Sequence, residues 1–239
     1  MEMSEALSRA IRASKKRGGL GVIAELKRRR FGGVDLLRER LAAEVARAYY
    51  SAGVTALSVV TSPWFGGSMR MLEEVSAANL GLPILRKDLI RTEKAIMASK
   101  RSGASAVLLV LPLLGLDRLV AMLQAARDES VEPFVEVATR REIEELREFY
   151  DGVIAINNAD IKTNETEGED ISRSVALIER EDPRLWVSAS RISSPEEVRM
   201  LAGAGFDAIL IGTHLLQADD ILLETNRIVA AARTIDTLA

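Results

Sequence analysis

Charged side chains close several apolar segments of this sequence, at points where a turn would normally contain Gly, Asn or Ser. Lys87 ends the segment PILRK, Glu25 and Lys27 close the segment GVIAELK, and Glu136 is enclosed by two valines in PFVEV. An ammonium group can donate a proton and a carboxylate can accept one, so these residue types suit general acid–base chemistry. Any one of them alone would more often be an exposed residue or half of an ion pair, because charged side chains lie mostly at the surface. Their repetition at segment ends favours a shared functional site.

The composition leaves few other chemistries open. The 239-residue chain contains no cysteine, which excludes disulfides, thiolate metal sites and a cysteine nucleophile. Its one histidine, His214, excludes His-rich zinc sites and weakens a Ser-His-Asp triad. Two leucines follow this histidine, a context that favours packing or a helix start over ligand binding. We therefore expect acid–base chemistry from Lys, Glu and Asp, with no metal site.

Eight β-rich segments recur along the chain, and a helical pattern follows each of them. The segments span residues 21–26, 54–60, 83–87, 106–111, 133–137, 152–157, 185–190 and 208–213. Amphipathic stretches between them include residues 36–53 and 139–150, while residues 193–205 begin with a Ser-Ser-Pro helix start and end in Gly. Continuous apolar strands that alternate with helices indicate a parallel sheet covered on both faces.

Eight such units without a break in composition predict a single-domain (β/α)8 TIM barrel of the α/β class, spanning residues 1–239. A doubly wound open sheet is the alternative architecture. It usually needs fewer strands at this length, and no G-x-G-x-x-G motif follows the first strand here. Residues 1–20 precede the first strand and carry Leu7 and Ile11 on one helical face, so we expect them to form a short N-terminal helical extension.

The barrel gives the charged residues a common location, since barrel proteins place functional side chains at the carboxyl ends of the strands. Glu25 and Lys27 are two residues apart, so both side chains point to the same side of their strand. The other polar residues at predicted strand ends are Lys87, Glu136, Asn157, Asn158, Ser188, Ser190, Gly212 and Thr213. We expect these groups to converge on one rim of the barrel.

The last two strand ends predict a phosphate site. The segments SASRISS and LIGTHLL place small residues between a strand and a helix, where backbone N–H groups and the helix dipole can bind a phosphate. Lys27 adds a cation beside them, because the first strand of a barrel closes against the eighth. Two nearby features have less certain meanings. Residues 28–30, three arginines, favour a solvated loop, whereas Trp64 and Phe65 fit loop packing and an aromatic substrate contact about equally.

Net charge and the distribution of apolar residues predict the cellular location and the binding partners of the protein. The net charge of −3 gives no indication of a nucleic-acid partner. The longest apolar run, residues 106–113, contains Pro112 and is too short to span a membrane, and the N-terminal segment has no secretory apolar core. We expect a cytoplasmic protein, monomeric or weakly homodimeric, that binds a small phosphorylated molecule and neither nucleic acid nor membrane. The excess of arginine over lysine is compatible with a thermophile or a GC-rich source.

Seven segments together resemble the indole-3-glycerol phosphate synthase family. They are VIAELKR, ALSVVTSPWFGGS, LPILRKDLI, GASAVLLVLPLL, EPFVEV, IAINNADIKT and GFDAILIGTHLL, in the family's order and over nearly the whole chain from residue 21. The resemblance implies the substrate 1-(o-carboxyphenylamino)-1-deoxyribulose 5-phosphate, which is ring-closed with loss of CO2 and water in tryptophan biosynthesis, without a metal or organic cofactor. It implies that Lys87 is the catalytic lysine, Lys27 the second lysine and Glu136 the acid–base group. Glu25 and Asn157 match polar residues that orient the substrate and the lysines.

The sequence also departs from the family pattern. The Ser-Pro-Ser after the first strand is replaced by Arg30-Phe31-Gly32, the arginine after the Asn pair by Ala159, and the Glu-Ser-Gly after the seventh strand by Ala189-Ser190-Arg191. We hypothesise that Arg191 contacts the phosphate and that one of the arginines at residues 28–30 replaces the lost contact to the substrate carboxylate. The candidate substrate- and phosphate-binding residues are then Lys27, Phe65, Ser190, Arg191, Gly212 and Thr213.

Because both lysines and Glu136 are retained, we expect an altered or slow synthase. One alternative is a diverged paralogue that acts on another phosphorylated sugar by isomerase or aldol-type chemistry. The other alternative is a non-catalytic barrel that binds a phosphate ligand. The fold cannot separate these readings, since barrels host many reactions.

Overall fold

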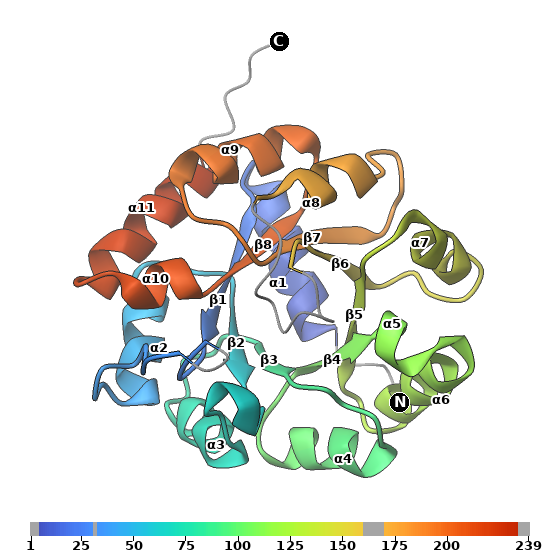
Figure 1. The fold of residues 1–239 in the computed structure, drawn as a ribbon, viewed down its shortest axis with the longest axis horizontal. Helices are drawn as coiled ribbons and strands as arrows, with labels where there is room; N and C mark the ends of the chain where they lie inside the picture. The colour runs from blue at the N-terminus through green and yellow to red at the C-terminus, as the bar shows by residue number, and fades with distance from the viewer. Residues whose placement is uncertain (1–4, 31–32, 160–169, 234–239) are drawn as a thin grey trace.

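The computed structural model describes residues 5–30, 33–159 and 170–233, and its strands form a closed barrel (Figure 1). Each strand is parallel to its neighbours, in the order β1-β2-β3-β4-β5-β6-β7-β8, and β1 pairs with β8. The strands are β1 Gly21–Leu26, β2 Ala56–Val60, β3 Ile84–Lys87, β4 Ala106–Val110, β5 Glu132–Val137, β6 Val153–Asn157, β7 Leu185–Ala189 and β8 Ala208–Ile211. The predicted (β/α)8 fold is confirmed.

Helices follow the strands and form a ring outside the barrel (Figure 1). They are α2 Ala42–Ser51, α3 Met69–Ala77, α4 Glu93–Arg101, α5 Leu111–Leu114, α6 Leu116–Asp128, α7 Arg140–Leu146, α8 Ser172–Leu177, α9 Pro195–Ala204, α10 Thr213–Gln217 and α11 Ile221–Arg233. Among the described residues, no helix is long and apolar enough to cross a membrane.

Side-chain caps explain where α3, α4, α7 and α9 begin. The Ser194 side chain accepts a hydrogen bond from the Glu197 backbone N–H at the start of α9, as the Ser-Ser-Pro pattern predicts. The helix predicted from residue 36 instead begins at Ala42, so its start was predicted too early. Arg38 adopts a left-handed conformation with φ of 47°, and the Arg40 guanidinium hydrogen-bonds backbone carbonyls of the preceding turn. These features stop the helix from extending toward β1.

The N-terminal helix α1, Ala6–Lys16, closes the N-terminal end of the barrel. Leu7 and Ile11 are fully buried and belong to the same apolar cluster as Phe134 and Leu185, whose side chains fill the interior of the barrel. The amphipathic pattern read from the sequence thus reflects packing against the strands. The interior is consequently a solid apolar core below the polar carboxyl ends of the strands.

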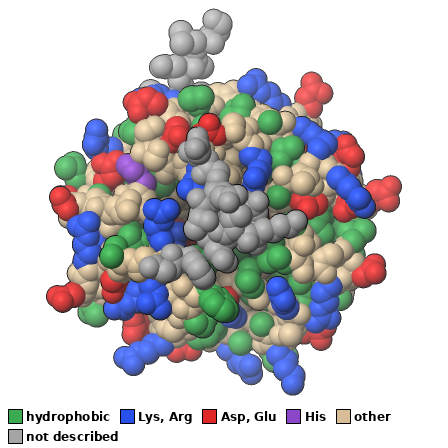
Figure 2. Space-filling view, in the orientation of Figure 1, with side chains coloured by type: hydrophobic (Ala, Val, Ile, Leu, Met, Phe, Trp, Pro, Cys, Tyr) green, Lys and Arg blue, Asp and Glu red, His purple; other side chains and the backbone are tan. Residues whose placement is uncertain are grey.

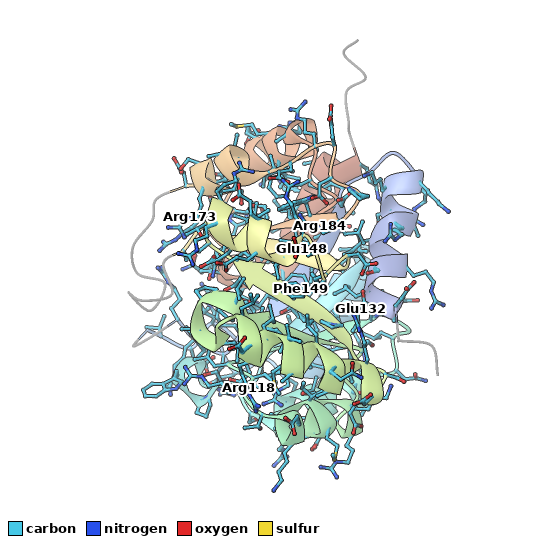
Figure 3. All side chains as sticks on the ribbon, turned by 90° about the vertical axis from the view of Figure 1, so that its right-hand side faces the viewer. Arg118, Glu132, Glu148, Phe149, Arg173 and Arg184 are labelled. Atoms are coloured by element: carbon cyan, nitrogen blue, oxygen red, sulfur yellow. The ribbon has the colours of Figure 1, made fainter. Side chains whose placement is uncertain are left out.

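Polar contacts fasten α1 to the barrel. Glu132, at the start of β5, accepts hydrogen bonds from the backbone N–H groups of Leu7 and Ser8 at 2.8 and 2.9 Å, and from the Ser8 hydroxyl. Burial raises the pKa of Glu132, and the hydrogen bonds from α1 only partly oppose this effect. Lys15 forms an ion pair of 2.6 Å with Asp207 before β8. In the side view, α1 and Glu132 lie on one side of the barrel and Arg173 lies on the other (Figure 3).

Truncation of the side chain that α1 inserts into the barrel should destabilise the whole fold. We expect Ile11→Ala to lower the free energy of unfolding by about 2–5 kcal/mol, because it leaves a cavity in a fully buried cluster. Urea denaturation at neutral pH measures the change. Arg9→Ala on the exposed face of α1 is the matched control and should change the value by less than about 0.5 kcal/mol. A similarly small effect of Ile11→Ala would contradict the role of α1 as a packed end of the barrel.

Candidate functional site

The alternation of side chains along β3 sorts its charged residues to opposite sides. Lys87 points into the barrel, whereas Arg86 points toward α4, where it contacts Ser99, and Asp88 directly after the strand pairs with Arg86. The Arg86 guanidinium donates hydrogen bonds to Thr61 Oγ1 at 2.8 Å, Ser99 Oγ at 3.0 Å and Asp88 Oδ2 at 2.9 Å. Arg86 and Asp88 therefore fasten β2, β3 and α4 together, and the run of three charges at the end of this strand contains one candidate functional group.

Glu25 forms ion pairs with both lysines that point toward the centre of the barrel. Its Oε1 lies 3.0 Å from Lys27 Nζ and its Oε2 lies 3.5 Å from Lys87 Nζ, and all three side chains are buried or nearly so. Burial alone would raise the pKa of Glu25, but the two ammonium groups outweigh it and lower the pKa to about 2. Glu25 is therefore a fixed anion that positions two cations, and it does not act as a proton donor near neutral pH.

Glu136 is the second carboxylate at this end of the barrel, and it contacts an amide. Asn157 Nδ2 donates a hydrogen bond of 3.0 Å to Glu136 Oε1, and both side chains are almost completely buried. The Asn157 Oδ1 atom accepts a hydrogen bond of 3.0 Å from the Ala159 backbone N–H. This second contact fixes which end of the amide faces Glu136. Asn157 therefore orients the Glu136 carboxylate.

These groups line a cavity of about 400 Å³, which we name the apolar compartment. Its lining residues are Glu25, Lys27, Val60, Ser62, Trp64, Phe65, Lys87, Asp88, Leu89, Leu108, Val110, Glu136 and Asn157. A neighbouring cavity of about 550 Å³ shares Glu25, Lys27 and Phe65 with it, and we name it the basic compartment. Polar lining residues of the basic compartment include Arg30, Ser190, Arg191, Ser193, Thr213, His214 and Gln217. The site thus combines one region for an apolar group with one region for an anion.

Both aromatic residues after β2 lie at the apolar compartment. They belong to a 3-10 turn, Pro63–Phe65, and the Phe65 ring centroid lies 5.9 Å from Lys27 Nζ. Trp64 is 68% exposed, so it does not serve as core packing. The loop folds back tightly after this turn, since a Cβ atom on Gly67 would lie 2.1 Å from the Val60 carbonyl oxygen. The exposure of Trp64 argues against the loop-packing reading, and the aromatic contact to a substrate stays a prediction.

The basic compartment is built on the loops after β7 and β8. Ser190 and Arg191 both have left-handed backbone conformations, with φ of 69° and 64°, which are unfavourable for residues with a Cβ atom. Gly212 lets the β8 loop approach β1, because a Cβ atom on it would lie 2.8 Å from the Glu25 Cβ atom. Thr213 begins α10 directly after this glycine. In the orientation of Figure 1, the surface of the protein carries both basic and acidic side chains around its centre (Figure 2).

The structure brings together the ten residues proposed as catalytic or binding groups. Asn158 and Ser188, which were expected on the same rim, line neither compartment and instead contact α8. Lys87, Glu136 and Asn157 line the apolar compartment, Ser190, Arg191, Gly212 and Thr213 line the basic compartment, and Glu25, Lys27 and Phe65 line both. The apolar lining by Leu89, Leu108 and Val110 was not nominated. Strand alternation would have found the last two, since they lie on the same side of β4. Residues 31–32 and 160–163, which belong to segments used in the family comparison, lie outside the described residues.

The arginines after β1 have different surroundings. Arg28 is exposed and pairs with Asp35 at 2.9 Å, as a solvated loop would predict. Arg30 lines the basic compartment and is absent from the lining of the apolar one. His214 is the second residue of α10, and its Nε2 lies 2.8 Å from Glu224 Oε1. Within the described part of the chain, no group of three His, Cys, Asp or Glu residues is arranged to hold a metal ion.

Comparisons with known proteins agree with this geometry. A family model described as indole-3-glycerol phosphate synthase matches residues 2–228. The chain is 37% identical to the indole-3-glycerol phosphate synthase of Carboxydothermus hydrogenoformans over 216 residues, which are 90% of this chain and 81% of that protein. It is 36% identical to indole-3-glycerol phosphate synthase 2 of Streptomyces coelicolor over 215 residues, 89% of this chain and 82% of that protein.

A solved structure is similar in fold alone. Thiamine phosphate pyrophosphorylase from Pyrococcus furiosus superimposes with a TM-score of 0.66 at 14% sequence identity, covering 92% of this chain and 98% of that one. The likeness supports the barrel architecture and carries no argument about chemistry.

Neutralisation of Glu25 should remove a pH-dependent contribution to stability. The pKa of Glu25 is lower in the folded protein than its ordinary value of 4.5. The stability that ionised Glu25 contributes is therefore fully present above pH 4.5 and is lost as the pH falls toward about 2. We expect the difference in free energy of unfolding between the wild type and Glu25→Gln to be constant above pH 4.5 and to shrink below it. Denaturant titrations across this range measure the difference.

The control for this measurement is Glu196→Gln, which alters an exposed carboxylate on α9. The free energy of unfolding of this variant should differ little from that of the wild type at every pH. A difference for Glu25→Gln that stays the same from neutral pH through the acidic range would show that the two lysines do not hold Glu25 as an anion.

Proposed function

The chain belongs to the indole-3-glycerol phosphate synthase family, and we propose that Lys87, Lys27 and Glu136 carry out its acid–base chemistry. The enzyme is a carboxy-lyase of tryptophan biosynthesis that acts on a phosphorylated small molecule. The observation that carries the assignment of residues is their placement. Two ammonium groups and a carboxylate, from β1, β3 and β5, line one cavity that adjoins a basic compartment.

The two compartments suit the two ends of 1-(o-carboxyphenylamino)-1-deoxyribulose 5-phosphate. We assign the aromatic ring to the apolar compartment, where Leu108, Val110 and Phe65 offer apolar contact. We assign the phosphate to the basic compartment, where Arg30, Arg191 and the loop before α10 supply positive charge and polar groups. Lys27 lines both compartments, so its ammonium group lies where the ribulose chain would join the two ends.

The reaction needs a proton donor at the ribulose C2 carbonyl and then both a donor and an acceptor. In ring closure, the aromatic carbon that bears the carboxylate bonds to C2, and a lysine ammonium group protonates the carbonyl oxygen. Loss of CO2 restores the aromatic ring. Dehydration then removes the C2 hydroxyl as water after protonation by a lysine, while the Glu136 carboxylate accepts the proton released from the substrate.

The way neighbouring residues hold Lys27, Lys87 and Glu136 in place also supports their assignment to acid–base chemistry. Glu25 holds Lys27 and Lys87 on either side of one carboxylate, and Asn157 holds Glu136. The reacting carbons belong to one flexible molecule, which must fold into a near-attack conformation before the new bond forms. Binding of its two ends in separate compartments would supply that conformation.

The departures from the family fall mostly on binding groups. Ala159 and Ala189 replace an arginine and a glutamate of the family pattern, while Arg191 replaces a glycine. We propose that Arg191 and Arg30 both serve the phosphate. Arg30 then does not replace the lost contact to the substrate carboxylate, and we expect a synthase with altered binding and a slower turnover. The retained acid–base set argues against a barrel that only binds ligands.

We extend the proposal to the cellular setting of the enzyme. Residues 1–239 form one domain that acts in the cytoplasm as a monomer or a weak homodimer, independently of nucleic acid and membranes. The continuous series of strand–helix units supports the single domain. The preference for arginine over lysine is compatible with a source adapted to heat or with a GC-rich genome.

Removal of the Lys87 ammonium group should strongly slow turnover while substrate still binds. We expect Lys87→Met to lower kcat by about 10²- to 10⁴-fold, the usual range for loss of a positioned proton donor. The assay follows the growth of indole fluorescence when purified protein meets the carboxyphenylamino substrate, and calorimetry follows substrate binding. Lys94→Met, at an exposed position on α4, is the control and should retain the wild-type rate.

Two outcomes of this experiment would contradict the proposal. A Lys87→Met protein that turns over like the wild type would show that Lys87 is not the proton donor. A Schiff base at Lys87, trapped by borohydride with a carbonyl substrate, would support the aldol-type alternative, because synthase chemistry needs no covalent intermediate at this lysine.

Loss of the Arg191 guanidinium should weaken the binding of the phosphorylated substrate. We expect Arg191→Ala to raise KM by about 10- to 100-fold with a smaller effect on kcat, as for loss of a hydrogen bond between charged groups. Steady-state kinetics with the same substrate measure both constants. Arg199→Ala on the surface of α9 is the control and should change neither. Unaltered affinity in Arg191→Ala would refute the phosphate contact.

A further inference from the structure

The side chain of Asn158 connects three segments of the chain behind the basic compartment. Its Nδ2 lies 3.1 Å from each of three acceptors, which are Ser188 Oγ, the Ala189 carbonyl oxygen and the Ser190 carbonyl oxygen. Its Oδ1 accepts a hydrogen bond of 3.0 Å from the Ser174 backbone N–H in α8. Asn158 is only 2% exposed, so these contacts are shielded from water.

These contacts are made to the loop that needs external support. Ser190 and Arg191 are consecutive residues with positive φ, and neither is a glycine. Such residues hold this conformation only when surrounding contacts fix it. Asn158 contacts two carbonyl groups of this loop. One belongs to Ala189, directly before the left-handed pair, and the other to Ser190, the first residue of the pair. The amide therefore lies where it can fix the conformation that brings Arg191 to the basic compartment.

The neighbouring asparagine serves the other compartment. Asn157 is the last residue of β6, and its side chain donates a hydrogen bond to Glu136. Asn158 points away from the apolar compartment toward β7 and α8. The first turn of α8 braces both residues. Arg173 donates hydrogen bonds to the backbone carbonyl groups of Asn157 and Ala159 at 2.8 and 3.1 Å. Figure 3 labels Arg173 on the side of the barrel opposite α1.

We infer that Asn158 is a positioning residue for the anion: it holds the Ser190–Arg191 loop in its left-handed conformation and so places Arg191 at the basic compartment. The inference rests on the proposed function, since it takes the basic compartment as the site of the substrate phosphate. An asparagine suits this place because it donates to carbonyl and hydroxyl oxygens through one atom while accepting a backbone N–H through the other. Alanine does neither, and aspartate would place a carboxylate against three acceptors.

The adjacent pair of asparagines allows a matched test. Inorganic phosphate is the probe for the basic compartment, with its dissociation constant measured by calorimetry in the absence of substrate. We expect Asn158→Ala to raise this constant and KM by about tenfold, while kcat changes by less than about threefold. We expect Asn157→Ala to give the opposite pattern, a kcat lowered by about tenfold or more and phosphate binding within about twofold of the wild type.

A second substitution separates positioning from general damage to the fold. Glycine adopts positive φ without a steric cost, so Ser190→Gly relieves part of the constraint that Asn158 imposes. In the Asn158→Ala background it should recover at least half of the lost phosphate affinity on a logarithmic scale. A defect caused by a cavity or by unfolding would not respond. If Asn158→Ala does not fold, Asn158→Ser is used instead, because its hydroxyl is too short to reach all three acceptors and should weaken phosphate binding in the same direction.

The outcomes distinguish this inference from the proposed function. If the wild type turns over substrate but the position-158 variant binds phosphate as the wild type does, the inference fails and the synthase assignment stands. If the wild type shows no turnover but phosphate binding depends on Asn158 as expected, the positioning role stands and the proposed function fails. A wild type that does not bind phosphate, or an Asn158→Ala defect confined to kcat, would overturn the inference.

Discussion

The ion pairs of Glu25 with Lys27 and Lys87 are the interaction on which the site depends. Two ammonium groups placed close together in a buried region would repel each other, and each would lose hydration. One carboxylate between them, 3.0 and 3.5 Å away, offsets part of that penalty and contacts both ammonium groups. Because the same lysines lower the pKa of Glu25 to about 2, the carboxylate between them stays ionised from neutral pH down through mildly acidic pH.

The barrel supplies this arrangement through the geometry of its strands. Neighbouring parallel strands bring their carboxyl ends to one rim, so residues far apart in sequence, such as Lys27 and Glu136, line one cavity. Alternation then separates functional charges from structural ones, as β3 shows, where Lys87 points inward and Arg86 fastens α4. The apolar interior and the N-terminal helix pack tightly beneath the rim. The same architecture therefore stabilises the fold at one end and leaves the other end for chemistry.

The sequence predicted most of this arrangement because the signals are local. Apolar strand segments lie within about two residues of the observed strands, and side-chain alternation places Glu25 and Lys27 on one face. Features set by contacts distant in sequence were missed or misjudged. The start of α2 depends on left-handed residues and on Arg40 contacts, and the location of Arg30 depends on how the β1 loop folds. The role of Asn158 could not be read either, since it requires knowing that α8 and the β7 loop meet behind it.

Two of the departures inferred from the family resemblance, at positions 189 and 191, would both make this end of the site less negative. Glycine at position 191 is neutral and arginine adds a positive charge, while alanine at position 189 removes the negative charge that a glutamate would bring to the barrel interior. Both changes favour an anion at this end of the site. In the basic compartment, Glu25 is then the one carboxylate among the described lining residues, and it is already committed to the two lysines. Under the proposed function, a phosphate dianion would therefore meet Arg30 and Arg191 without a competing carboxylate, while Glu136 and Asn157 on the other side of Glu25 keep their hydrogen bond.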